Sequence, residues 1–179
     1  MDYWPNIDAV AWFVSDVLPK IRAERPQARF VIVGSTPTAE VKALGRDTAV
    51  TVTGRVEDVR PYVYHAGCVV APLRLARGVQ NKVLEAMSMA RPIVASPAAL
   101  EGLPFGEEQS ILVVTAASDW ASSVLSLLAR DTTGRHDQRA RQAVAAAFGW
   151  DASGEGLARL IAPMSSAPED AVNDGRIQL

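Results

Sequence analysis

The chain has 179 residues, of which 18 are Lys or Arg and 20 are Asp or Glu, so its formal net charge is −2 with both histidines neutral. This near balance argues against a general nucleic-acid binder, which carries a strongly basic surface. With 49% hydrophobic and 21% charged residues, the composition is that of a globular protein and excludes a wholly disordered chain. The single cysteine, Cys68, lies in an apolar run and cannot form an internal disulfide, which fits a reducing compartment.

No apolar run approaches the ~18–20 residues that span a bilayer, and residues 1–10 lack the basic and then apolar order of a signal peptide. We therefore expect a soluble, cytoplasmic protein. The apolar pattern is lost from about Met164. This predicts one folded domain over residues 1–163 and a poorly ordered tail over residues 164–179.

The predicted elements alternate between helices and short apolar strands. A long helix is expected after Asn6, its N-cap, because apolar residues recur every three or four positions until Pro26. Strands are expected at residues 29–33, 50–53, 68–71, 92–96 and 111–114, with helices near residues 41–44, 59–65, 79–90 and 120–128. Continuously apolar strands joined by helical crossovers indicate a doubly wound, Rossmann-like α/β fold with a mainly parallel sheet.

Ligands of such sheets bind at the carboxyl ends of the strands. After the first strand, Gly34 and Ser35 open a turn of small residues that suits a phosphate or a ribose, although a plain strand-to-helix turn explains it equally well. After the second strand, Asp58 is expected to cap the next helix, while Arg55 either reaches a ligand or lies in solvent.

The densest segment follows the third strand, where Arg74, Arg77 and Gly78 lie in a loop that leads directly into a helix. A helix amino end offers unpaired N–H groups and about half a positive charge, so the segment predicts an anion site. Together with Gly34 and Gly54, we expect Arg74 and Gly78 to lie along one edge of the sheet.

The helix that follows has two distinct faces. At about 100° per residue, Asn81, Lys82 and Glu85 lie on one side. The opposite side carries the apolar residues Val83, Leu84, Met87 and Ala90. The polar side is either part of a ligand site or a solvated surface on which Lys82 and Glu85 form an i,i+3 ion pair.

Two other kinds of site are not supported by the sequence. No Gly-x-Ser-x-Gly occurs, so there is no sign of a serine-hydrolase nucleophile. His65 and His136 have no partners at metal-ligand spacing, so we expect no metal.

Several segments together are similar to one known family. They are Pro72-Leu73-Arg74, Gly78 to Lys82, Leu84 to Ser96, Glu101-Gly102-Leu103, the opening Asp2 to Val10 with Trp12-Phe13, Val33 to Pro37, and Thr53 to Val56. The chain resembles the donor-binding, C-terminal half of GT-B glycosyltransferases of family four, and in particular the sugar transferases of exosortase and exopolysaccharide gene clusters. The resemblance covers about Asp2 to Ala162, and the helix motif through Glu85 is its most specific part.

The resemblance implies that a nucleotide diphosphate sugar is the donor, and that the sugar, a hexose, passes with retention to an acceptor in a cleft between two Rossmann-like domains. It implies no further cofactor, and a role in polysaccharide or cell-envelope glycan synthesis. Glu85 matches the glutamate that binds the ribose hydroxyls, Val56 matches a base contact, and Arg74 and Lys82 would stabilise the leaving group. The donor-binding set implied by the match further comprises Gly34, Ser35, Arg55, Gly78, Val79 and Asn81.

The chain departs from the family at residue 77, where Arg77 stands in place of the first of two glutamates eight positions apart. Arg77 then either offsets diphosphate charge or faces solvent. The segment from Trp150 through Leu157, Leu160 and Ile161 resembles the helix that crosses back to an N-terminal acceptor domain, which is not in this sequence. Its apolar surface would favour self-association, and the full-length enzyme would associate peripherally with a membrane.

Two alternatives to a transferase stay open on the sequence alone. The first is a nucleotide-sugar binding module that turns nothing over as an isolated fragment. The second is half of a nucleotide-sugar epimerase, an enzyme built on the same two-domain fold. The segment from Gly78 to Glu85 favours the transferase.

Overall fold

The protein is described by a computed structural model that covers residues 2–106, 111–129, 138–150, 154–155 and 158–159. The chain divides into two compact units, residues 1–144 and 145–179, and the fold and site below belong to the first. The expected tail at 164–179, the helix positions Leu157, Leu160 and Ile161, and His136 lie outside the described residues. In the second unit, the side chain of Trp150 is exposed.

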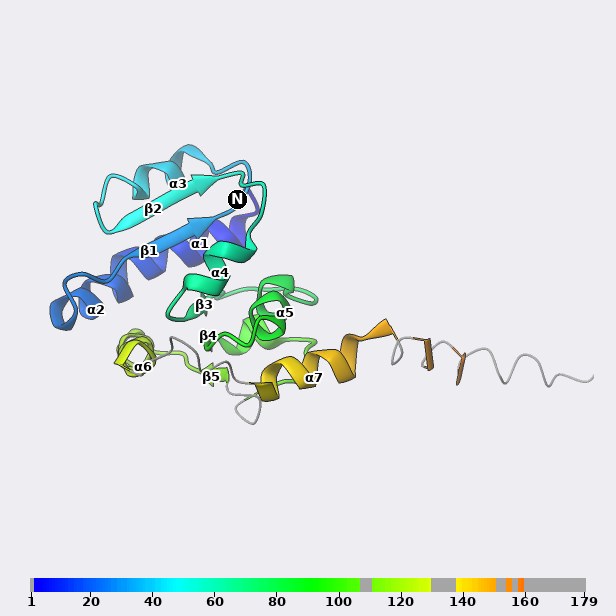
Figure 1. The fold of residues 1–179 in the computed structure, drawn as a ribbon. Coiled ribbons are helices and arrows are strands. Elements are labelled where there is room, and N and C mark those ends of the chain that lie inside the picture. The colour runs from blue at the N-terminus through cyan, green and yellow to red at the C-terminus, as the bar shows by residue number, and fades with distance from the viewer. Residues whose placement is uncertain (1, 107–110, 130–137, 151–153, 156–157, 160–179) are drawn as a thin grey trace, which may run out of the picture. The chain divides into compact units, whose positions relative to one another are not determined.

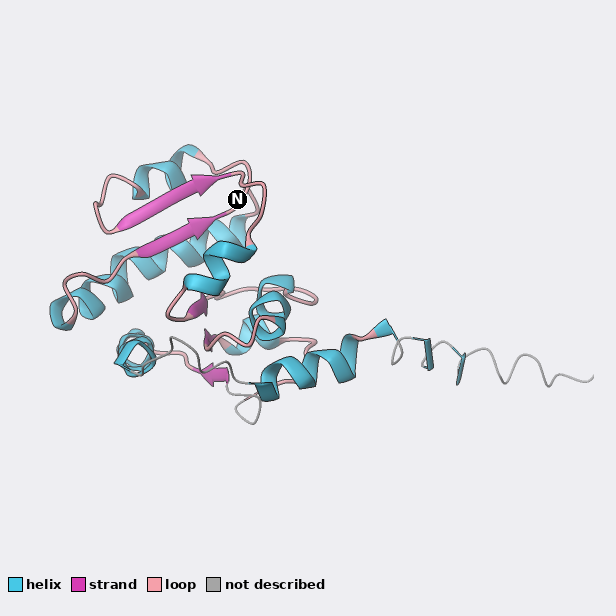
Figure 2. Ribbon diagram, in the orientation of Figure 1, coloured by secondary structure: helices cyan, strands magenta, loops and turns pink. Residues whose placement is uncertain are grey.

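The elements follow the predicted alternation of helices and strands (Figures 1 and 2). They are α1 (Trp4–Trp12), η1 (Phe13–Val17), α2 (Leu18–Glu24), β1 (Phe30–Val33), α3 (Ala39–Leu44), β2 (Val50–Gly54), α4 (Arg60–His65), β3 (Val69–Ala71), α5 (Asn81–Ser88), β4 (Ile93–Ala95), η2 (Pro97–Leu100), β5 (Ile111–Val113), α6 (Ala117–Ala129) and α7 (Gln138–Phe148). The predicted α/β class with parallel strands and flanking helices is confirmed. No helix in the described ranges is both long and apolar enough to cross a lipid bilayer.

The strands form two parallel sheets instead of one continuous sheet. β1 pairs with β2, beginning with Phe30 opposite Val50. β4 lies between β3 and β5, with Ile93 opposite both Val69 and Ile111. β1 and β3 are therefore each an edge strand, with one neighbour apiece among the described residues.

The first helix begins earlier than the sequence suggested. Its N-cap is Tyr3, in an extended conformation, and Pro5 lies in the first turn, where its missing N–H leaves no bond unmade. The prediction that Asn6 is the N-cap is wrong, because a proline start needs no side-chain cap. Asn6 lies inside α1, and its side chain makes a different contact, described below.

The helix widens into the π-helical segment η1 just before Pro19. A proline within a helix removes an N–H donor and crowds the carbonyl four residues earlier, here that of Ser15. A wider turn relieves this crowding and keeps the chain helical. The Lys20 ammonium donates to the Asp16 carbonyl oxygen at 2.9 Å within the same turn. The run from Trp4 to Glu24 is thus continuously helical and leads into β1.

Two apolar cores hold these layers together. One joins α5 to β3, β4 and β5, and includes Ala71, Met87 and Ile93. The other joins the first helix and α6 to β1 and β2, and is centred on Trp120. The Trp120 ring meets Trp12 edge to face at 6.1 Å between centroids and Phe13 at 6.2 Å.

Candidate functional site

The amino end of α5 has no side-chain cap. Gly78, in the loop before it, has φ +69°, a conformation that favours glycine. The Gln80 side chain donates to the carbonyl oxygen of Gly78 at 3.1 Å, which fixes this turn. Gln80 is the N-cap but makes no side-chain cap, and the first turn carries no acidic residue. Among the described side chains, none caps the first N–H groups of α5, so this helix end keeps a partial positive charge that suits an anion.

The two faces of α5 are arranged as predicted. Val83, Ala86 and Met87 are completely buried on the core side. On the other side, Asn81 and Glu85 are exposed, and Lys82 is half-buried between them. The helix motif therefore presents an amide, an ammonium and a carboxylate to the outside of the sheet.

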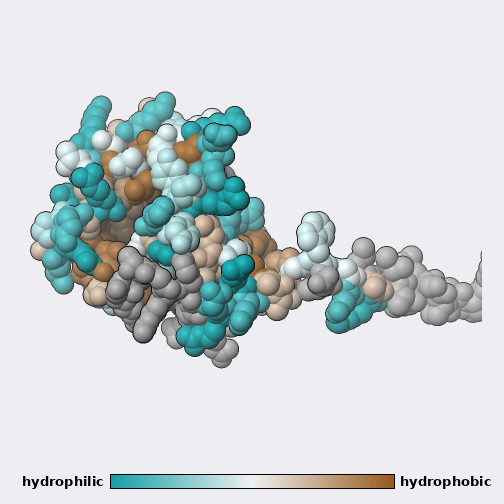
Figure 3. All heavy atoms as spheres, in the orientation of Figure 1, coloured by the Kyte–Doolittle hydropathy of each residue, from teal (hydrophilic) through white to brown (hydrophobic). Residues whose placement is uncertain are grey.

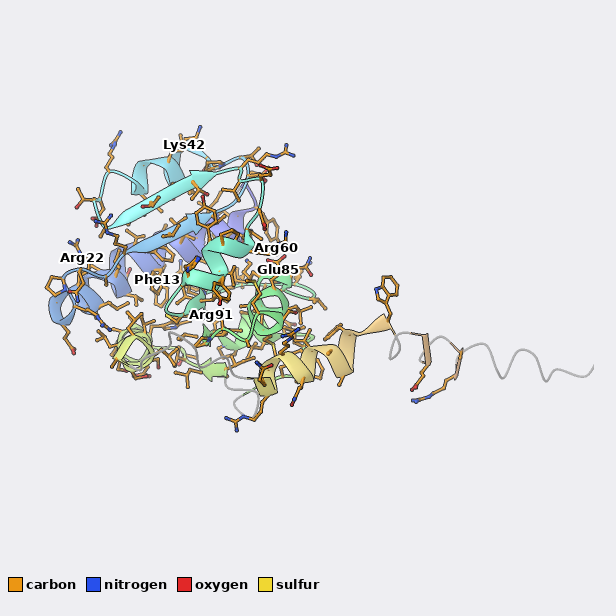
Figure 4. The ribbon with its side chains drawn as sticks, viewed as in Figure 1. Phe13, Arg22, Lys42, Arg60, Glu85 and Arg91 are labelled. Carbon is orange, nitrogen blue, oxygen red and sulfur yellow. The ribbon has the colours of Figure 1, made fainter. Side chains whose placement is uncertain are left out.

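Lys82 is held by α1 and not by its helix neighbour. Its ammonium donates to the Asn6 side-chain oxygen at 2.6 Å. Burial lowers the pKa of Lys82, and the nearby Glu85 carboxylate opposes this effect. Among the described side chains, no ion pair joins Lys82 to Glu85, so the solvated i,i+3 pair is not formed. Figure 4 labels Glu85 on α5; within the described part of the chain, no side chain forms an ion pair with its carboxylate.

Arg74, in the loop after β3, is fixed by Asp8 on α1. The guanidinium donates from Nε to one carboxylate oxygen at 2.8 Å and from Nη2 to the other. Asp8 is largely buried, with 12% of its side chain exposed, whereas 56% of Arg74 is exposed. The hydrogen bond from Arg74, aided by its charge, lowers the pKa of Asp8 although burial acts in the opposite direction. The positive charge of Arg74, which was predicted to bind an anion, is thus already partly compensated by the Asp8 carboxylate.

We expect the Asp8–Arg74 ion pair to make the stability of the protein depend on pH. Because the folded-state pKa of Asp8 lies below its unfolded value, the pair stabilises the fold above about pH 4 and is lost as pH falls through the folded pKa. Asp8→Asn should cost about 0.5–1 kcal/mol near neutral pH and less at acidic pH, as a pair with one exposed partner does. Urea unfolding of both proteins at pH 7 and pH 3 measures this, and an equal loss at both values would contradict it.

The loop that carries Arg74 is also held by Ser96, the residue directly after β4. The buried Ser96 hydroxyl donates to the Leu73 carbonyl oxygen and accepts from the Ala99 N–H at 3.1 Å. Three contacts therefore fix this loop. They are the ion pair between Arg74 and Asp8, the hydrogen bond from Ser96, and the burial of the Leu73 side chain. Fixed geometry of this kind lets a binding loop meet a ligand at little entropic cost.

A second group of predicted residues follows β1 and β2. The Gly34 N–H donates to the Gly54 carbonyl oxygen at 3.4 Å, so the two loops touch. Ser35 and Arg55 are exposed and Val56 is half-buried. Asp58 was predicted to cap the next helix, but the N-cap is Val59, and the helix has no side-chain cap. The Asp58 carboxylate, one residue earlier, accepts the Arg60 N–H at 2.9 Å as well as the Arg60 guanidinium. The Arg60 label in Figure 4 marks this helix, α4.

The structure thus brings the predicted residues into two groups. Arg74, Lys82 and Glu85 gather around the amino end of α1, while Gly34, Ser35, Arg55 and Val56 occupy the loops after β1 and β2. In the described parts of the chain, no three His, Cys, Asp or Glu side chains are placed to hold a metal ion.

Asn6 and Asp8 are the site residues that the sequence did not assign. They contact Lys82 and Arg74 across 76 and 66 positions of the chain, respectively. One signal was present, because Asn6 precedes Ala9 and Phe13 on the buried face at helical spacing of three and seven residues. A polar residue on an apolar stripe indicates a buried partner.

Comparison with protein families and with solved structures agrees with this fold. A family model described as "Glycosyl transferases group 1" matches residues 1–130. No curated protein sequence matches the chain.

Solved structures with a similar fold include sucrose-phosphate synthase from Thermosynechococcus elongatus, with a TM-score of 0.67 and 22% identity, covering 92% of this chain and 43% of that one. The pneumococcal O-GlcNAc transferase GtfA, in complex with UDP and GlcNAc, has a TM-score of 0.63 and 12% identity, covering 88% and 33%. HepE of Anabaena, in complex with UDP, has a TM-score of 0.56 and 18% identity, covering 93% and 45%. The chain thus spans less than half the length of each of these proteins.

Proposed function

Because the chain belongs to the group 1 glycosyl transferases, we propose that it binds the nucleotide diphosphate sugar that serves as the donor in sugar transfer. The full-length enzyme, with a second domain for the acceptor, would transfer a hexose in cytoplasmic synthesis of a polysaccharide or cell-envelope glycan. One observation carries the proposal: the uncapped amino end of α5 lies beside the half-buried Lys82 and one turn before the exposed Glu85.

The proposed binding mode follows from charge. The diphosphate lies at the loop and helix start formed by Gly78, Val79 and Asn81, where the N–H groups face outward. Lys82 supplies the nearest buried positive charge, and Asn6 holds it in place at 2.6 Å. Glu85 accepts hydrogen bonds from the two ribose hydroxyls, since an exposed carboxylate offers acceptor oxygens only.

The base and the sugar are assigned to the loops after β1 and β2. Val56, half-buried, offers an apolar contact to the base, and Arg55 is exposed beside it. Gly34 and Ser35 form the small-residue turn that a ribose or phosphate can approach closely. The contact between Gly34 and Gly54 supports treating the two loops as one surface.

In the transfer step, the bond between the anomeric carbon and the β-phosphate oxygen breaks, the anomeric carbon bonds to an acceptor oxygen, and the acceptor proton passes to the departing diphosphate. The electron pair of the broken bond stays on the nucleoside diphosphate, so negative charge grows there. The fixed N–H groups of α5 and the Lys82 ammonium stabilise this charge more strongly as it develops. Arg74 contributes less in this proposal because Asp8 already accepts from it.

Nucleotide titration tests the proposal directly. The similar structures of GtfA and HepE are complexes with UDP, so UDP is the first probe, with GDP, ADP and UMP beside it. We expect one nucleoside diphosphate to raise the melting temperature of the chain, since a ligand of the native state stabilises it by mass action. The monophosphate should bind more weakly because it lacks the second phosphate. No response to any diphosphate would overturn the proposal.

The isolated chain should bind the donor without transferring its sugar. Its sequence spans less than half the length of the similar enzymes, and a cleft closed by two domains supplies much of the rate in such reactions. Incubation with a nucleotide sugar and analysis of the products distinguishes the alternatives. A changed sugar configuration without an acceptor would indicate an epimerase, and sugar transfer by the chain alone would contradict this expectation.

A further inference from the structure

The loop between β3 and α5 carries two arginines in different electrostatic environments. Arg74 donates to the Asp8 carboxylate, so part of its charge is compensated. Arg77 is exposed, and none of the described carboxylates forms an ion pair with it. The guanidinium of Arg77 therefore keeps its N–H donors for solvent or for a ligand.

The backbone that carries Arg77 is fixed, although its side chain is not. The Gln80 side chain donates to the carbonyl oxygens of Arg77 and Gly78, at 3.4 and 3.1 Å respectively. Apart from its chain neighbours, no heavy atom lies within 4 Å of the position that a Cβ would take on Gly78. The turn thus borders open space and presents Arg77 from a fixed base, which lowers the entropic cost of binding a ligand there.

A cavity beside α5 shows where the nucleoside end of the proposed donor fits. Its volume is about 750 Å³, and its lining includes Lys82 and Glu85 of α5 together with Val59, which follows the loop of Val56. The lining is largely apolar, which suits a base and a ribose ring. In Figure 3, apolar side chains gather in the recessed middle of the face shown, bordered by hydrophilic ones. Arg77 is not part of this lining.

The order of groups along α5 then places the sugar. In a nucleotide diphosphate sugar, the diphosphate joins the ribose at one end to the sugar at the other. Glu85, the proposed ribose ligand, lies about 6 Å along the helix axis from Asn81, the first residue of α5. With the diphosphate at this helix start, the sugar lies beyond it, on the side of the loop that carries Arg77.

The diphosphate has positive groups of its own. The amino end of α5 carries a partial positive charge, and the Lys82 ammonium is held beside it by Asn6 at 2.6 Å. Arg74 is likewise held against α1 by Asp8. No described side-chain contact ties Arg77 to α1, so its charge is additional to this set and lies at the sugar end.

The chemistry of a guanidinium indicates what it recognises. Arginine has five N–H donors and no acceptor, so it cannot accept a hydrogen bond from a sugar hydroxyl. A neutral hexose would leave its charge uncompensated. A carboxylate matches the planar fork with two parallel hydrogen bonds and an opposite charge.

We infer that the donor sugar is acidic, a hexose whose terminal carbon is oxidised to a carboxylate, and that Arg77 binds this carboxylate. The inference rests on the proposed donor site, since that site sets the direction of the ligand. Arg77 is then a residue that determines the choice of sugar, and the ribose and diphosphate contacts do not depend on it.

Calorimetry with matched donors tests the inference. UDP-glucuronate is compared with UDP-glucose, and UDP-galacturonate with UDP-galactose. We expect the acidic member of at least one pair to bind about fivefold more tightly, the size of one charge pair near a surface, and the difference to shrink as salt is raised. Arg77→Ala should remove the preference, and Arg77→Glu should reverse it, because like charges repel.

Arg46→Ala is the matched control. Arg46 is also an exposed arginine directly beside a glycine, and none of the described carboxylates forms an ion pair with it. It lies between α3 and the amino end of β2, away from the strand carboxyl ends. Its loss should leave the preference for the acidic sugar in place.

Three outcomes would overturn the inference while the proposed donor site stands. The first is binding of UDP with no preference for the acidic sugar in either pair. The second is a preference that survives in Arg77→Ala, which places the carboxylate elsewhere. The third is an equal loss of affinity for UDP and for the acidic donor in Arg77→Ala, which assigns Arg77 to the diphosphate. No binding of any nucleoside diphosphate would overturn the donor site itself, and this inference with it.

Discussion

Replacing Glu85 by alanine should abolish detectable binding of the nucleoside diphosphate while the protein stays folded. In the proposed mode the Glu85 carboxylate accepts from two ribose hydroxyls, and hydrogen bonds to a charged group contribute about 1.5–3 kcal/mol each. Loss of about 1.4 kcal/mol is already a tenfold change in affinity. Glu85→Gln keeps the shape and one carbonyl acceptor, so it should weaken binding without abolishing it. Calorimetry with the best diphosphate measures both.

Glu24→Ala is the matched control for this substitution. Glu24 is also an exposed glutamate near a helix end, but it lies in α2 before the amino end of β1, away from the strand carboxyl ends. Both alanine variants should melt within a few degrees of the parent, as exposed helix positions do. Unchanged nucleotide affinity in a folded Glu85→Ala variant would make Glu85 a surface residue with no part in binding.

Replacing Trp120 by alanine should cost about 3–5 kcal/mol of stability, a large share of the total for a domain of this size. Only 1% of the Trp120 side chain is exposed. Its ring packs edge to face against Trp12 and Phe13, so truncation removes aromatic contacts as well as buried area and leaves a cavity between the first helix and α6. Chemical unfolding monitored by circular dichroism gives the difference.

Trp150 offers the same substitution in the opposite environment. Its side chain is 93% exposed, so Trp150→Ala should change stability by no more than about 0.5 kcal/mol. Both variants remove the same side-chain atoms, so the difference between their losses of unfolding free energy measures how much the core depends on Trp120. A loss below about 1 kcal/mol for Trp120→Ala would mean that the second core does not depend on this ring.

The elements themselves could be predicted from the sequence because each has a local pattern. The strand at 50–53 was expected within one residue of β2 (Val50–Gly54), and α6 carries the apolar residues that marked it. The division into two sheets could not be predicted. Strand pairing depends on the side-by-side placement of segments such as β1 and β3, about which a run of apolar residues carries no information.

The site shows the same difference between local and distant contacts. The polar face of α5 depends on residues a few positions apart, and this prediction is confirmed. The predicted cap was misplaced by one residue, because Val59 and not Asp58 is the N-cap of α4. The partners of Arg74 and Lys82 come from α1, 66 and 76 positions away, and no spacing rule covers such a distance. Whether the predicted residues bind a nucleotide is a question for the titrations above.

The widened turn at η1 also sets the rotational phase between the two halves of the first helix. Ala9, Phe13, Val17 and Ile21 are all buried, and they are spaced by four residues. In a regular α-helix, each step of four residues rotates by about 40° beyond a full turn, so such a stripe would wind off the core. Wider turns cancel this drift. Loss of one residue from η1 would rotate α1, which carries the partners of Lys82 and Arg74, by about 100° relative to α2, which packs against α6. The geometry of the site is thus adjusted from the middle of a helix that touches no ligand.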